Sequence, residues 1–396
     1  MKVGSVSSDS SSNSTLKPGQ DEAFFQPAMS DQSASLYEHC ARSLDVSLSL
    51  GAHGLPLIGT GDWNDGMNRV GEKGRGESVW LGWFLIATIG AFVPLAEARG
   101  DRARATRWRE WSRRVSAALE DTGWDGSWYR RGYYDDGTPL GSATSGECRI
   151  DAIAQSWSVM SGMADPAHAT QAMAAVEQHL IWRDVAIAPL FTPPFDRTPL
   201  DPGYIKGYPP GIRENGGQYT HGSIWSIFAF SLLGQGDQAG ALFSILNPIH
   251  HGADPAALAC YKVEPYVACA DVYSVAPHVG RGGWTWYTGS AAWMYRAGIE
   301  AGLGLRRQGG TLVVDPCIPT GWPGYEVTFR YRNAQGIVTR YEIAVENPHR
   351  VSRGVVRTEV DGIECLPQRN AAVVTLADDG RVHRVRVVLA RPPGSR

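Results

Sequence analysis

The hydrophobic residues between Ser35 and Leu303 recur with a helical period, and this pattern constrains the fold more than any other feature. Fully apolar segments such as Val79–Glu97 alternate with polar-faced segments such as Arg102–Leu119. A helix that is apolar all round is buried, whereas an amphipathic helix covers it from outside. The alternation therefore predicts two concentric rings of helices and a mainly α fold. The predicted helices are Ser35–Leu50, Val79–Glu97, Arg102–Leu119, Ile150–Met163, Ala167–Leu180, His221–Leu233, Asp237–Leu246 and Ser290–Ala301.

The hydrophobic period changes to two near residue 310. Val327, Phe329 and Tyr331 alternate with polar residues, and a second clear alternation covers Val382–Leu389. This pattern predicts strands, and the turn signals between them predict antiparallel pairing. We therefore expect a small antiparallel β domain over residues 309–392. A helical region over residues 21–308 precedes it, after a disordered, Ser-rich leader over residues 1–20.

The composition favours a sugar-binding enzyme over a nucleic-acid-binding protein. Lys plus Arg total 37 and Asp plus Glu total 40, so the net charge is −3 and no basic surface for nucleic acid is expected. The 46 glycines among 396 residues exceed the usual share of about 7%. The 14 Trp and 15 Tyr residues can line a cleft. The six cysteines form no CxxC pair, so no metal site is expected.

The uncharged stretch Val79–Ala96 has two interpretations. Its 18 residues reach the lower limit of a membrane span, about 17 residues. A helix buried inside the core of a soluble protein has the same composition. The glycines and Pro94 within the stretch favour the buried helix. Since the N-terminus also shows no apolar secretory signal, we expect a cytoplasmic protein.

The segment Gly51–Gly66 carries two carboxylates beside an aromatic ring. Asp62 and Asp65 flank Trp63 and Asn64. Glycosidic cleavage needs an acid that protonates the leaving oxygen, and an adjacent ring can stack on the sugar and raise the pKa of that acid by excluding water. An Asx turn beside a buried Trp explains the same spacing. The spacing alone leaves both interpretations open.

A second segment, residues 211–225, is a candidate anion site. It contains a tight Asn-Gly-Gly turn, and His221 follows at the start of a predicted helix with Arg213 nearby. A helix N-terminus combined with these two side chains suits an oxyanion or a phosphate group. A lone His more often caps or packs a helix, and this alternative also stays open.

A third segment, residues 280–293, runs through Thr288 and Gly289 into the last predicted helix. Backbone N–H groups and a hydroxyl at a helix start can hold an anion, although a Gly-rich run by itself is a weak signal. Glu264 lies in a loop before this segment. It could bind sugar hydroxyls or pair with Lys262.

Six long stretches, in order along the chain, resemble glycoside hydrolase family 94, formerly glycosyltransferase family 36. They are LYEHCARSLDVSLSLGAHGLPLIGTGDWNDGMNRVG, DGSWYRRGYYDDGTPLGS, IDAIAQSWSVMSG, ENGGQYTHGSIW, EPYVACADVYS and GRGGWTWYTGSAAWMYR. The resemblance spans about residues 21–392. This family contains inverting phosphorylases of cellobiose, chitobiose and β-1,2-glucans. Within it, the stretches are most similar to the C-terminal, phosphorylase-like region of bacterial cyclic β-1,2-glucan synthases.

The resemblance implies a fold and a set of site residues. The family fold is an (α/α)6 toroid followed by a C-terminal β domain. The second Asp of the DWND motif is the general acid of the family, which corresponds to Asp65, and the Trp of the motif, Trp63, lines the sugar site. The implied phosphate site consists of His221, Thr288 and Gly289, to which we add Arg213. The other candidate substrate-binding residues are Asp62, Gln218, Glu264 and Tyr266.

The implied reaction is the inverting phosphorolysis of a β-glucan, with a β-1,2 linkage favoured. An inverting hydrolase needs two carboxylates, whereas phosphate is itself the nucleophile of a phosphorylase. Asp65 would protonate the glycosidic oxygen while inorganic phosphate, the co-substrate, attacks the anomeric carbon and forms α-glucose 1-phosphate. No metal and no other cofactor is expected.

Two other hypotheses stay open. One is an inverting glucan hydrolase with Asp65 as acid and Asp62 or Glu264 as base. The other is a glucan-binding fragment without catalysis. It follows from the expectation that the toroid is incomplete at its N-terminal side, because the family places a β-sandwich, a linker and the first barrel helices before the DWND loop. We also expect the upstream portion of a longer synthase as a partner, with association of that parent protein with the inner membrane and a homodimer as further options.

Overall fold

The computed structural model describes residues 33–391, and the chain divides into two units between Ser49 and Leu50. In the first unit, α2 (Leu36–Val46) begins after Ser35, whose hydroxyl accepts a hydrogen bond from the Glu38 backbone N–H at 3.2 Å. Ser is a preferred residue at this position because its oxygen satisfies a free N–H group of the first turn. The predicted leader over residues 1–20 lies outside the described residues.

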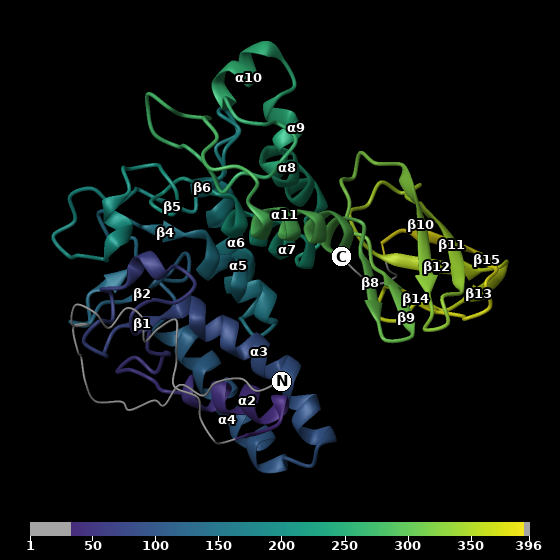
Figure 1. Ribbon diagram of the computed structural model, residues 1–396, viewed down its shortest axis with the longest axis horizontal. Coiled ribbons are helices and arrows are strands. Elements are labelled where there is room, and N and C mark those ends of the chain that lie inside the picture. Colours follow the sequence, from purple (N-terminus) through teal and green to yellow (C-terminus); the bar gives the residue numbers. More distant parts are fainter. Residues whose placement is uncertain (1–32, 392–396) are drawn as a thin grey trace. The chain divides into compact units, whose positions relative to one another are not determined.

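Four helices are successive neighbours in the second unit, and the first three of them are apolar (Figure 1). They are α3 (Val79–Ala98), α5 (Ala152–Ser161), α7 (Thr220–Leu232) and α11 (Thr288–Arg296). The first three are each backed by the next helix of the chain, namely α4 (Arg102–Asp121), α6 (Pro166–Leu180) and α8 (Gly236–Leu246). Inner and outer helices therefore form two layers, as the alternation in the sequence predicts.

The apolar helix α3 is long enough to cross a membrane, and it is the only helix within residues 33–391 that combines this length with sufficient hydropathy. Its mean hydropathy is 1.9, and 50% of that stretch is buried within the structure. It packs against α4 and α5. A core helix meets the same criteria of length and composition, so these criteria alone do not distinguish the two interpretations.

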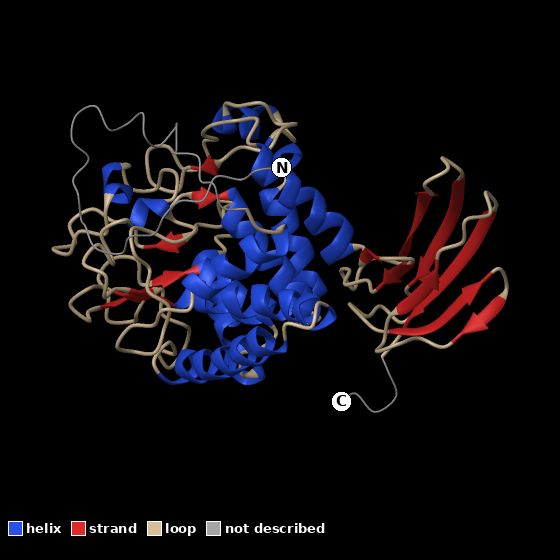
Figure 2. Ribbon diagram, turned by 60° about the horizontal axis from the view of Figure 1, so that its bottom comes forward, coloured by secondary structure: helices blue, strands red, loops and turns tan. Residues whose placement is uncertain are grey.

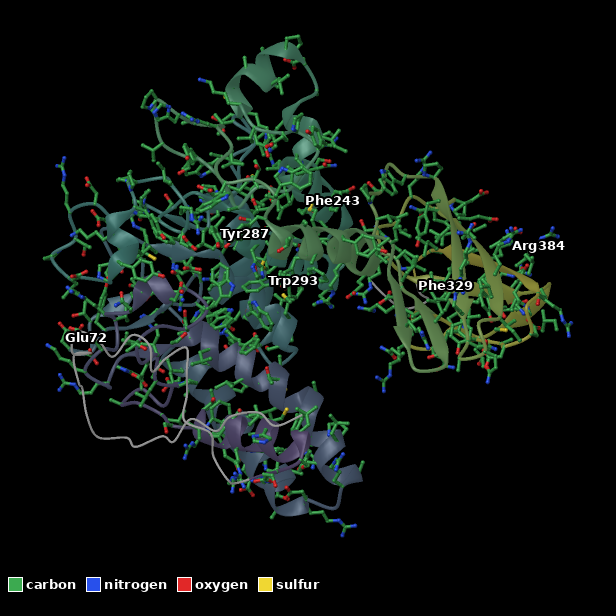
Figure 3. All side chains as sticks on the ribbon, in the orientation of Figure 1. Glu72, Phe243, Tyr287, Trp293, Phe329 and Arg384 are labelled. Carbon is green, nitrogen blue, oxygen red and sulfur yellow. The ribbon has the colours of Figure 1, made fainter. Side chains whose placement is uncertain are left out.

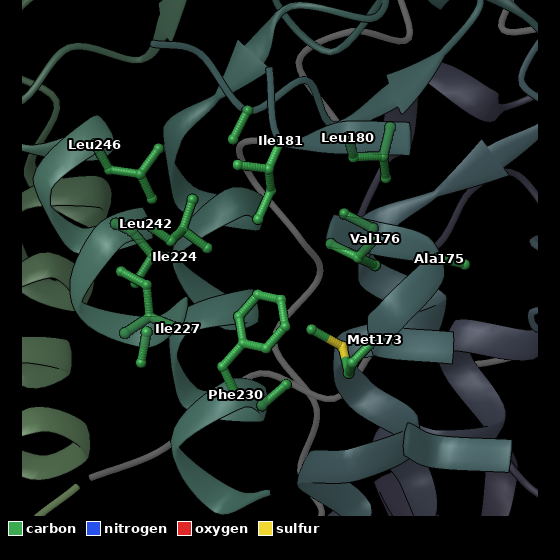
Figure 4. Packing of buried hydrophobic residues seen from close by; sticks show 14 of the residues in the cluster. Met173, Ala175, Val176, Leu180, Ile181, Ile224, Ile227, Phe230, Leu242 and Leu246 are labelled. Carbon is green, nitrogen blue, oxygen red and sulfur yellow. The ribbon is translucent and has the colours of Figure 1, made fainter. Parts of the chain in front are cut away.

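The core between α6, α7 and α8 holds α7 in place (Figure 4). Met173 and Val176 of α6 share a cluster with Ile224, Ile227 and Phe230 of α7, and none of these side chains is more than 2% exposed. Burying a side chain of this size stabilises the fold by about 1.5–3 kcal/mol. This packing fixes the helix whose first turn carries His221.

Three of the inner helices begin directly after a two-residue strand. The pairs are β1 (Glu77–Ser78) with β2 (Gly132–Tyr133), which also pairs with β3 (Pro139–Leu140), β4 (Ile150–Asp151) with β5 (Phe191–Thr192), and β6 (Gln218–Tyr219) with β7 (Asp271–Val272). These pairs tie the N-terminal ends of α3, α5 and α7 to long loops, which gather at one end of the helices (Figure 2). Two residues are too few to show an alternation, so the sequence pattern did not predict these strands.

The remaining elements of this region are short. They are η1 (Asp65–Met67), η2 (Tyr204–Gly207), α9 (Pro248–His251), α10 (Pro255–Tyr261) and the π-helical turn η3 (Ala297–Gly302).

A β domain follows η3, as the change of period predicts. It has a three-stranded sheet in the order β14-β9-β8 and a five-stranded sheet in the order β10-β11-β15-β12-β13. The strands are β8 (Leu305–Gln308), β9 (Thr311–Val314), β10 (Gly324–Arg332), β11 (Val338–Glu346), β12 (Val355–Val360), β13 (Ile363–Cys365), β14 (Ala372–Thr375) and β15 (Val382–Leu389). One pair departs from the antiparallel expectation, because β11 and β15 are parallel. Parallel neighbours need a long crossover, which the chain supplies through β12, β13 and β14.

Candidate active site

A cavity of about 410 Å³ lies where the loops meet the first turns of the inner helices. Three segments supply most of its wall: the loop around η1, the loop that contains η2, and the start of α7. The lining residues are Asp62, Trp63, Asp65, Tyr204, Tyr208, Arg213, Glu214, Tyr219, His221 and Tyr287. Segments far apart in the sequence, including the predicted 51–66 and 211–225 stretches, therefore meet in one place.

Asp65 is the exposed carboxylate of the DWND loop. It is the first residue of η1, and the Tyr204 side chain is hydrogen-bonded to it. Gly61 makes the close turn before it, since its φ is +128° and a Cβ there would lie 3.0 Å from the Asp65 Cα. Burial and the neighbouring Asp65 charge raise the pKa of Tyr204 to about 12, so Tyr204 keeps its proton and donates it to the hydrogen bond.

The side chain of Asp62 is fully buried and bound on both carboxylate oxygens. Arg131 donates to it through two guanidinium nitrogens, each at 2.6 Å, and the Ser78 hydroxyl donates at 2.6 Å. The side chains of Asp62 and Arg131 are both 0% exposed. Burial by itself would raise the pKa of Asp62, but the Arg131 charge and these hydrogen bonds outweigh it and lower the pKa below its ordinary value. Asp62 therefore fixes the loop and has no free oxygen for a base.

A second buried carboxylate lies on the other side of the same guanidinium. The Asp151 Oδ2 atom is 3.3 Å from the Arg131 Nε atom. Burial raises the pKa of Asp151 to about 6, in spite of the attraction to Arg131. We call Asp62, Arg131 and Asp151 the buried ionic network. It joins the DWND loop to β2 and to the residue that caps α5.

Trp63 separates the cavity from the interior of the helical region. Its ring lies 5.6 Å from the Tyr219 ring, 5.5 Å from the His221 ring and 5.1 Å from the Trp225 ring of α7. Trp225 in turn contacts one Trp from each of the other inner helices, namely Trp80, Trp157 and Trp293 (Trp293 and Tyr287 are labelled in Figure 3). The predicted aromatic wall at Trp63 thus rests on a cluster of tryptophans.

His221 lies in the first turn of α7 and points toward the start of α11. A Cβ built on Gly289 would lie 3.9 Å from the His221 Nδ1 atom, so His221 and the predicted Thr288-Gly289 pair are brought together. Thr288 and Gly289 do not line the cavity themselves, but the preceding Tyr287 does. Burial lowers the pKa of His221 to about 4, and its Nε2 atom has no hydrogen-bond partner within residues 33–391. A neutral imidazole with an unused nitrogen can donate one hydrogen bond to an anion.

Arg213 is held among aromatic rings. Its guanidinium carbon lies 5.8 Å from the rings of Tyr208 and Tyr219 and 5.9 Å from those of Trp284 and Tyr287. Its backbone has a φ of +53°, and its N–H donates to the Asp271 Oδ2 atom at 2.7 Å, which holds this unusual conformation. We call Tyr204, Tyr208, Arg213 and Tyr287 the aromatic rim of the cavity.

Glu214 is a cavity residue that the sequence pattern did not single out. Its Oε2 atom lies 3.6 Å from the Arg213 Nε atom, and within the described part of the chain it has no hydrogen-bond partner although it is buried. Tyr204, Tyr208, Tyr219 and Tyr287 were also missed. The sequence offered one signal for Glu214, the charged pair Arg213-Glu214 directly before the Asn-Gly-Gly turn. Charged residues are rarely buried in a turn unless they are paired or have a function.

Three predicted substrate-binding residues lie outside the cavity. Gln218 is 1% exposed, and its side-chain oxygen accepts a hydrogen bond from the Ala188 backbone N–H at 2.8 Å, so it joins two loops. Glu264 is hydrogen-bonded to the side chains of Thr285 and Trp286. Tyr266 is 70% exposed beside the Trp286 ring. Periodicity could not place these side chains because loop geometry decides where they point.

Within residues 33–391, no group of three or more His, Cys, Asp or Glu side chains is arranged to hold a metal ion. The described cysteines are all free thiols. The chemistry that the cavity offers is therefore one exposed carboxylic acid, one more carboxylate beside an Arg, a neutral imidazole near a helix start, and aromatic walls.

Comparison with known proteins adds two family matches. Residues 10–304 match the family described as "Glycosyl hydrolase 94 superfamily, catalytic domain", and residues 305–339 match "Glycosyl hydrolase family 65, C-terminal domain". The first match contains all the cavity residues.

Several curated proteins are similar over most of this chain. The cyclic beta-(1,2)-glucan synthase NdvB of Rhizobium meliloti (strain 1021) is 51% identical over 342 residues, which are 86% of this chain and 12% of that protein. The 3-O-beta-D-glucopyranosyl-beta-D-glucuronide phosphorylase of Paenibacillus borealis is 36% identical, over 84% of this chain and 42% of its own length. The N,N'-diacetylchitobiose phosphorylase of Vibrio proteolyticus is 33% identical, over 88% and 42%. The chain spans less than half the length of each of these relatives.

Among solved structures, one titled "Sialidase" has a TM-score of 0.50 and 14% sequence identity, over 73% of this chain and 26% of that one. At this identity the likeness concerns the fold alone.

Proposed function

The chain belongs to the glycosyl hydrolase 94 superfamily, and on that premise we propose that it catalyses the inverting phosphorolysis of a β-glucan to α-glucose 1-phosphate. The phosphorylases and the glucan synthase among its relatives support this reaction class. A β-1,2 linkage is the proposed one because the relative with 51% identity is named for it.

The observation that carries the proposal is the unequal state of the two carboxylates in the DWND loop. Asp65 is exposed to the cavity, whereas Asp62 is fully buried and bound by Arg131 and Ser78. An inverting hydrolase with this pair would need Asp62 to activate water. A phosphorylase needs only the acid, because phosphate supplies the nucleophile.

The start of α11 and His221 form the proposed phosphate site. The free N–H groups at a helix N-terminus favour an anion, and the Thr288 hydroxyl can add a hydrogen bond. The neutral His221 can donate one hydrogen bond, and its Nδ1 atom is the ring nitrogen nearest Gly289 at the start of α11. Arg213 adds a positive charge at the same cavity.

In the proposed reaction, Asp65 donates its proton to the glycosidic oxygen as the bond to the anomeric carbon breaks. Phosphate attacks that carbon from the opposite face, so the configuration inverts and α-glucose 1-phosphate forms. Trp63 would exclude water from one side of the sugar. Positioning of the two reactants supplies most of the rate enhancement, because one proton transfer accounts for only about 10²–10⁴. Inorganic phosphate is the proposed co-substrate, and no cofactor takes part.

Glu214 supports a second candidate, an inverting hydrolase. It is a further carboxylate in the cavity, and its buried oxygen has no hydrogen-bond partner within residues 33–391. In this alternative, Glu214 would replace Asp62 and Glu264 as the base. The salt bridge to Arg213 argues for a sugar-binding role instead, since it ties the carboxylate to a fixed cation.

The test is an assay of linear β-1,2-gluco-oligosaccharides with and without inorganic phosphate. Glucose 1-phosphate that forms only with phosphate, and not with Asp65→Asn, supports phosphorolysis. Release of reducing sugar without phosphate, lost in Glu214→Gln, supports the hydrolase. If the folded chain binds the oligosaccharides and turns over none of them under either condition, the chain is a glucan-binding region and both proposals are wrong.

We also propose that the two helix layers form part of an (α/α)6 toroid and that the chain acts within a longer cyclic glucan synthase. A homodimer and a cytoplasmic location also stay proposals.

A further inference from the structure

Three large aromatic side chains in the loops that precede α11 are exposed to solvent. Trp284 is 73% exposed, Trp286 is 66% exposed and Tyr266 is 70% exposed. Exposed aromatic groups that gather in one place mark binding sites, because isolated ones are common but clusters are not. None of the three lines the 410 Å³ cavity.

Contacts connect Asp65 to Trp284, and the chain leads from Trp284 to the neighbouring pair Trp286 and Tyr266. Asp65 is hydrogen-bonded to Tyr204, whose ring lies 6.3 Å from that of Tyr208. The Arg213 guanidinium lies 5.8 Å from Tyr208 and 5.9 Å from Trp284. Trp286 follows two residues later, and its ring lies 6.5 Å from the Tyr266 ring. The series leads from the cavity across the aromatic rim to the surface.

The backbone fixes these rings in their exposed positions. The Ala270 N–H donates to the Trp284 carbonyl at 2.6 Å, and the Tyr287 N–H donates to the Ala268 carbonyl at 3.0 Å. Trp286 has a φ of +58°, and its side chain is hydrogen-bonded to the Glu264 carboxylate. A β-branched or bulky residue adopts such a φ only where its surroundings impose it.

We propose that Trp284, Trp286 and Tyr266 form an outer binding track for a β-linked glucan chain, extending from the cavity so that the enzyme engages several glucosyl units at once. This inference rests on the proposed function. The ring faces of β-glucosyl units carry C–H groups and pack on aromatic rings, while their hydroxyls stay in water at the edges. Arg213 lines the cavity and lies 5.9 Å from the Trp284 ring, so the proposed track begins where the cavity ends. The track uses few charges, which suits a neutral chain.

The test is the dissociation constant as a function of chain length, measured by calorimetry on the full chain with linear β-1,2-gluco-oligosaccharides of two to eight units and no phosphate. We expect affinity to rise with length in the wild type. In Trp284→Ala, the affinity for long oligosaccharides falls by about five- to tenfold relative to the wild type, as expected for loss of one stacked aromatic contact. Trp286→Ala and Tyr266→Ala should also weaken the binding of long oligosaccharides.

Leu366→Ala is the control. Leu366 is 89% exposed in the β domain and lines neither the 410 Å³ cavity nor the pocket that contains Tyr266, so its removal leaves the length dependence unchanged. Because binding is measured without turnover, a failure of phosphorolysis does not affect this result. Affinity that is independent of length in the wild type overturns the track. An unchanged length dependence in the variants also overturns it. Light scattering then shows whether the exposed rings instead join two copies of the chain.

A second measurement uses the wild type alone. Acrylamide quenches the fluorescence of exposed tryptophans, and an octasaccharide should protect Trp284 and Trp286 where a disaccharide does not. Equal quenching with both sugars contradicts the proposal.

Discussion

The buried ionic network and the aromatic rim both contribute residues to the same cavity but are built differently. Asp62, Arg131 and Asp151 are at most 1% exposed and are joined by charge, whereas Tyr204 is 50% exposed and Arg213 is surrounded by rings. Buried charges stabilise only one geometry, because an unpaired partner is costly. Aromatic surfaces tolerate several positions of a ligand. The network therefore suits a fixed proton donor, and the rim suits a glucan chain that must enter and leave.

The largest expected effect is on activity and concerns Asp65, the exposed carboxylate of the loop that the network holds. Asp65→Asn should lower phosphorolysis by about 10²–10⁴-fold, because proton donation to the leaving oxygen is lost. The melting temperature should stay unchanged, since the side chain is exposed. Glucose 1-phosphate release and circular dichroism measure the two quantities. If the variant were as active as the wild type, Asp65 would not be the general acid.

Breaking the network should affect stability most. Arg131→Met leaves Asp62 and Asp151 without their buried cation and should lower the free energy of unfolding by about 3–5 kcal/mol. The control is Arg340→Met, which breaks an Arg340–Glu342 pair whose side chains are 47% and 37% exposed. That pair should contribute at most about 1 kcal/mol. Urea unfolding of both variants sharpens the comparison, and equal losses would contradict it.

The raised pKa of Asp151 predicts how stability depends on pH. A carboxyl group whose pKa is about 6 when folded and near 3.8 when unfolded binds its proton more tightly in the folded state. Its contribution is complete below pH 4 and is lost as the pH rises through 6. Relative to Asp151→Asn, the wild type should lose up to about 3 kcal/mol between pH 4 and pH 7.

Urea unfolding of the wild type and Asp151→Asn at several pH values checks this prediction. The difference between the two proteins isolates Asp151 from the other carboxylates. A difference that does not vary with pH, or that changes in the opposite direction, would show that Asp151 is ionised in the folded protein throughout this range.

The smallest expected effect concerns the rim. Tyr204→Phe removes the hydrogen bond to Asp65 and should lower kcat by about two- to fivefold, because Tyr204 is 50% exposed and water can replace the lost hydroxyl. Initial rates at saturating phosphate and glucan give the value. Tyr295→Phe, at a 71% exposed residue outside the cavity, is the control. A loss as large as that of Asp65→Asn would show that the rim is as rigid as the network.

The sequence predicted much of the fold because periodicity is a local property. The helices α3 to α8 and the β domain follow from residues that are neighbours in the chain, such as the capping Asp101 of α4 and the Asp165-Pro166 start of α6. The resemblance to a family added the candidate roles of Asp65 and His221, which the structure brings to one cavity. Those roles stay predictions until activity is measured.

The sequence by itself determined the long helices, the alternating strands of the β domain, and that Asp62, Trp63 and Asp65 are neighbours in one segment. Tertiary structure alone decided that Asp62 is bound by Arg131, 69 residues away, while Asp65 stays exposed. It also decided that Glu214 reaches the cavity and that Gln218, Glu264 and Tyr266 do not. The physical reason is that burial and pairing depend on which loops meet. Loop positions here are set by two-residue strand pairs whose partners are distant in the chain, and these leave no periodic signal in the sequence.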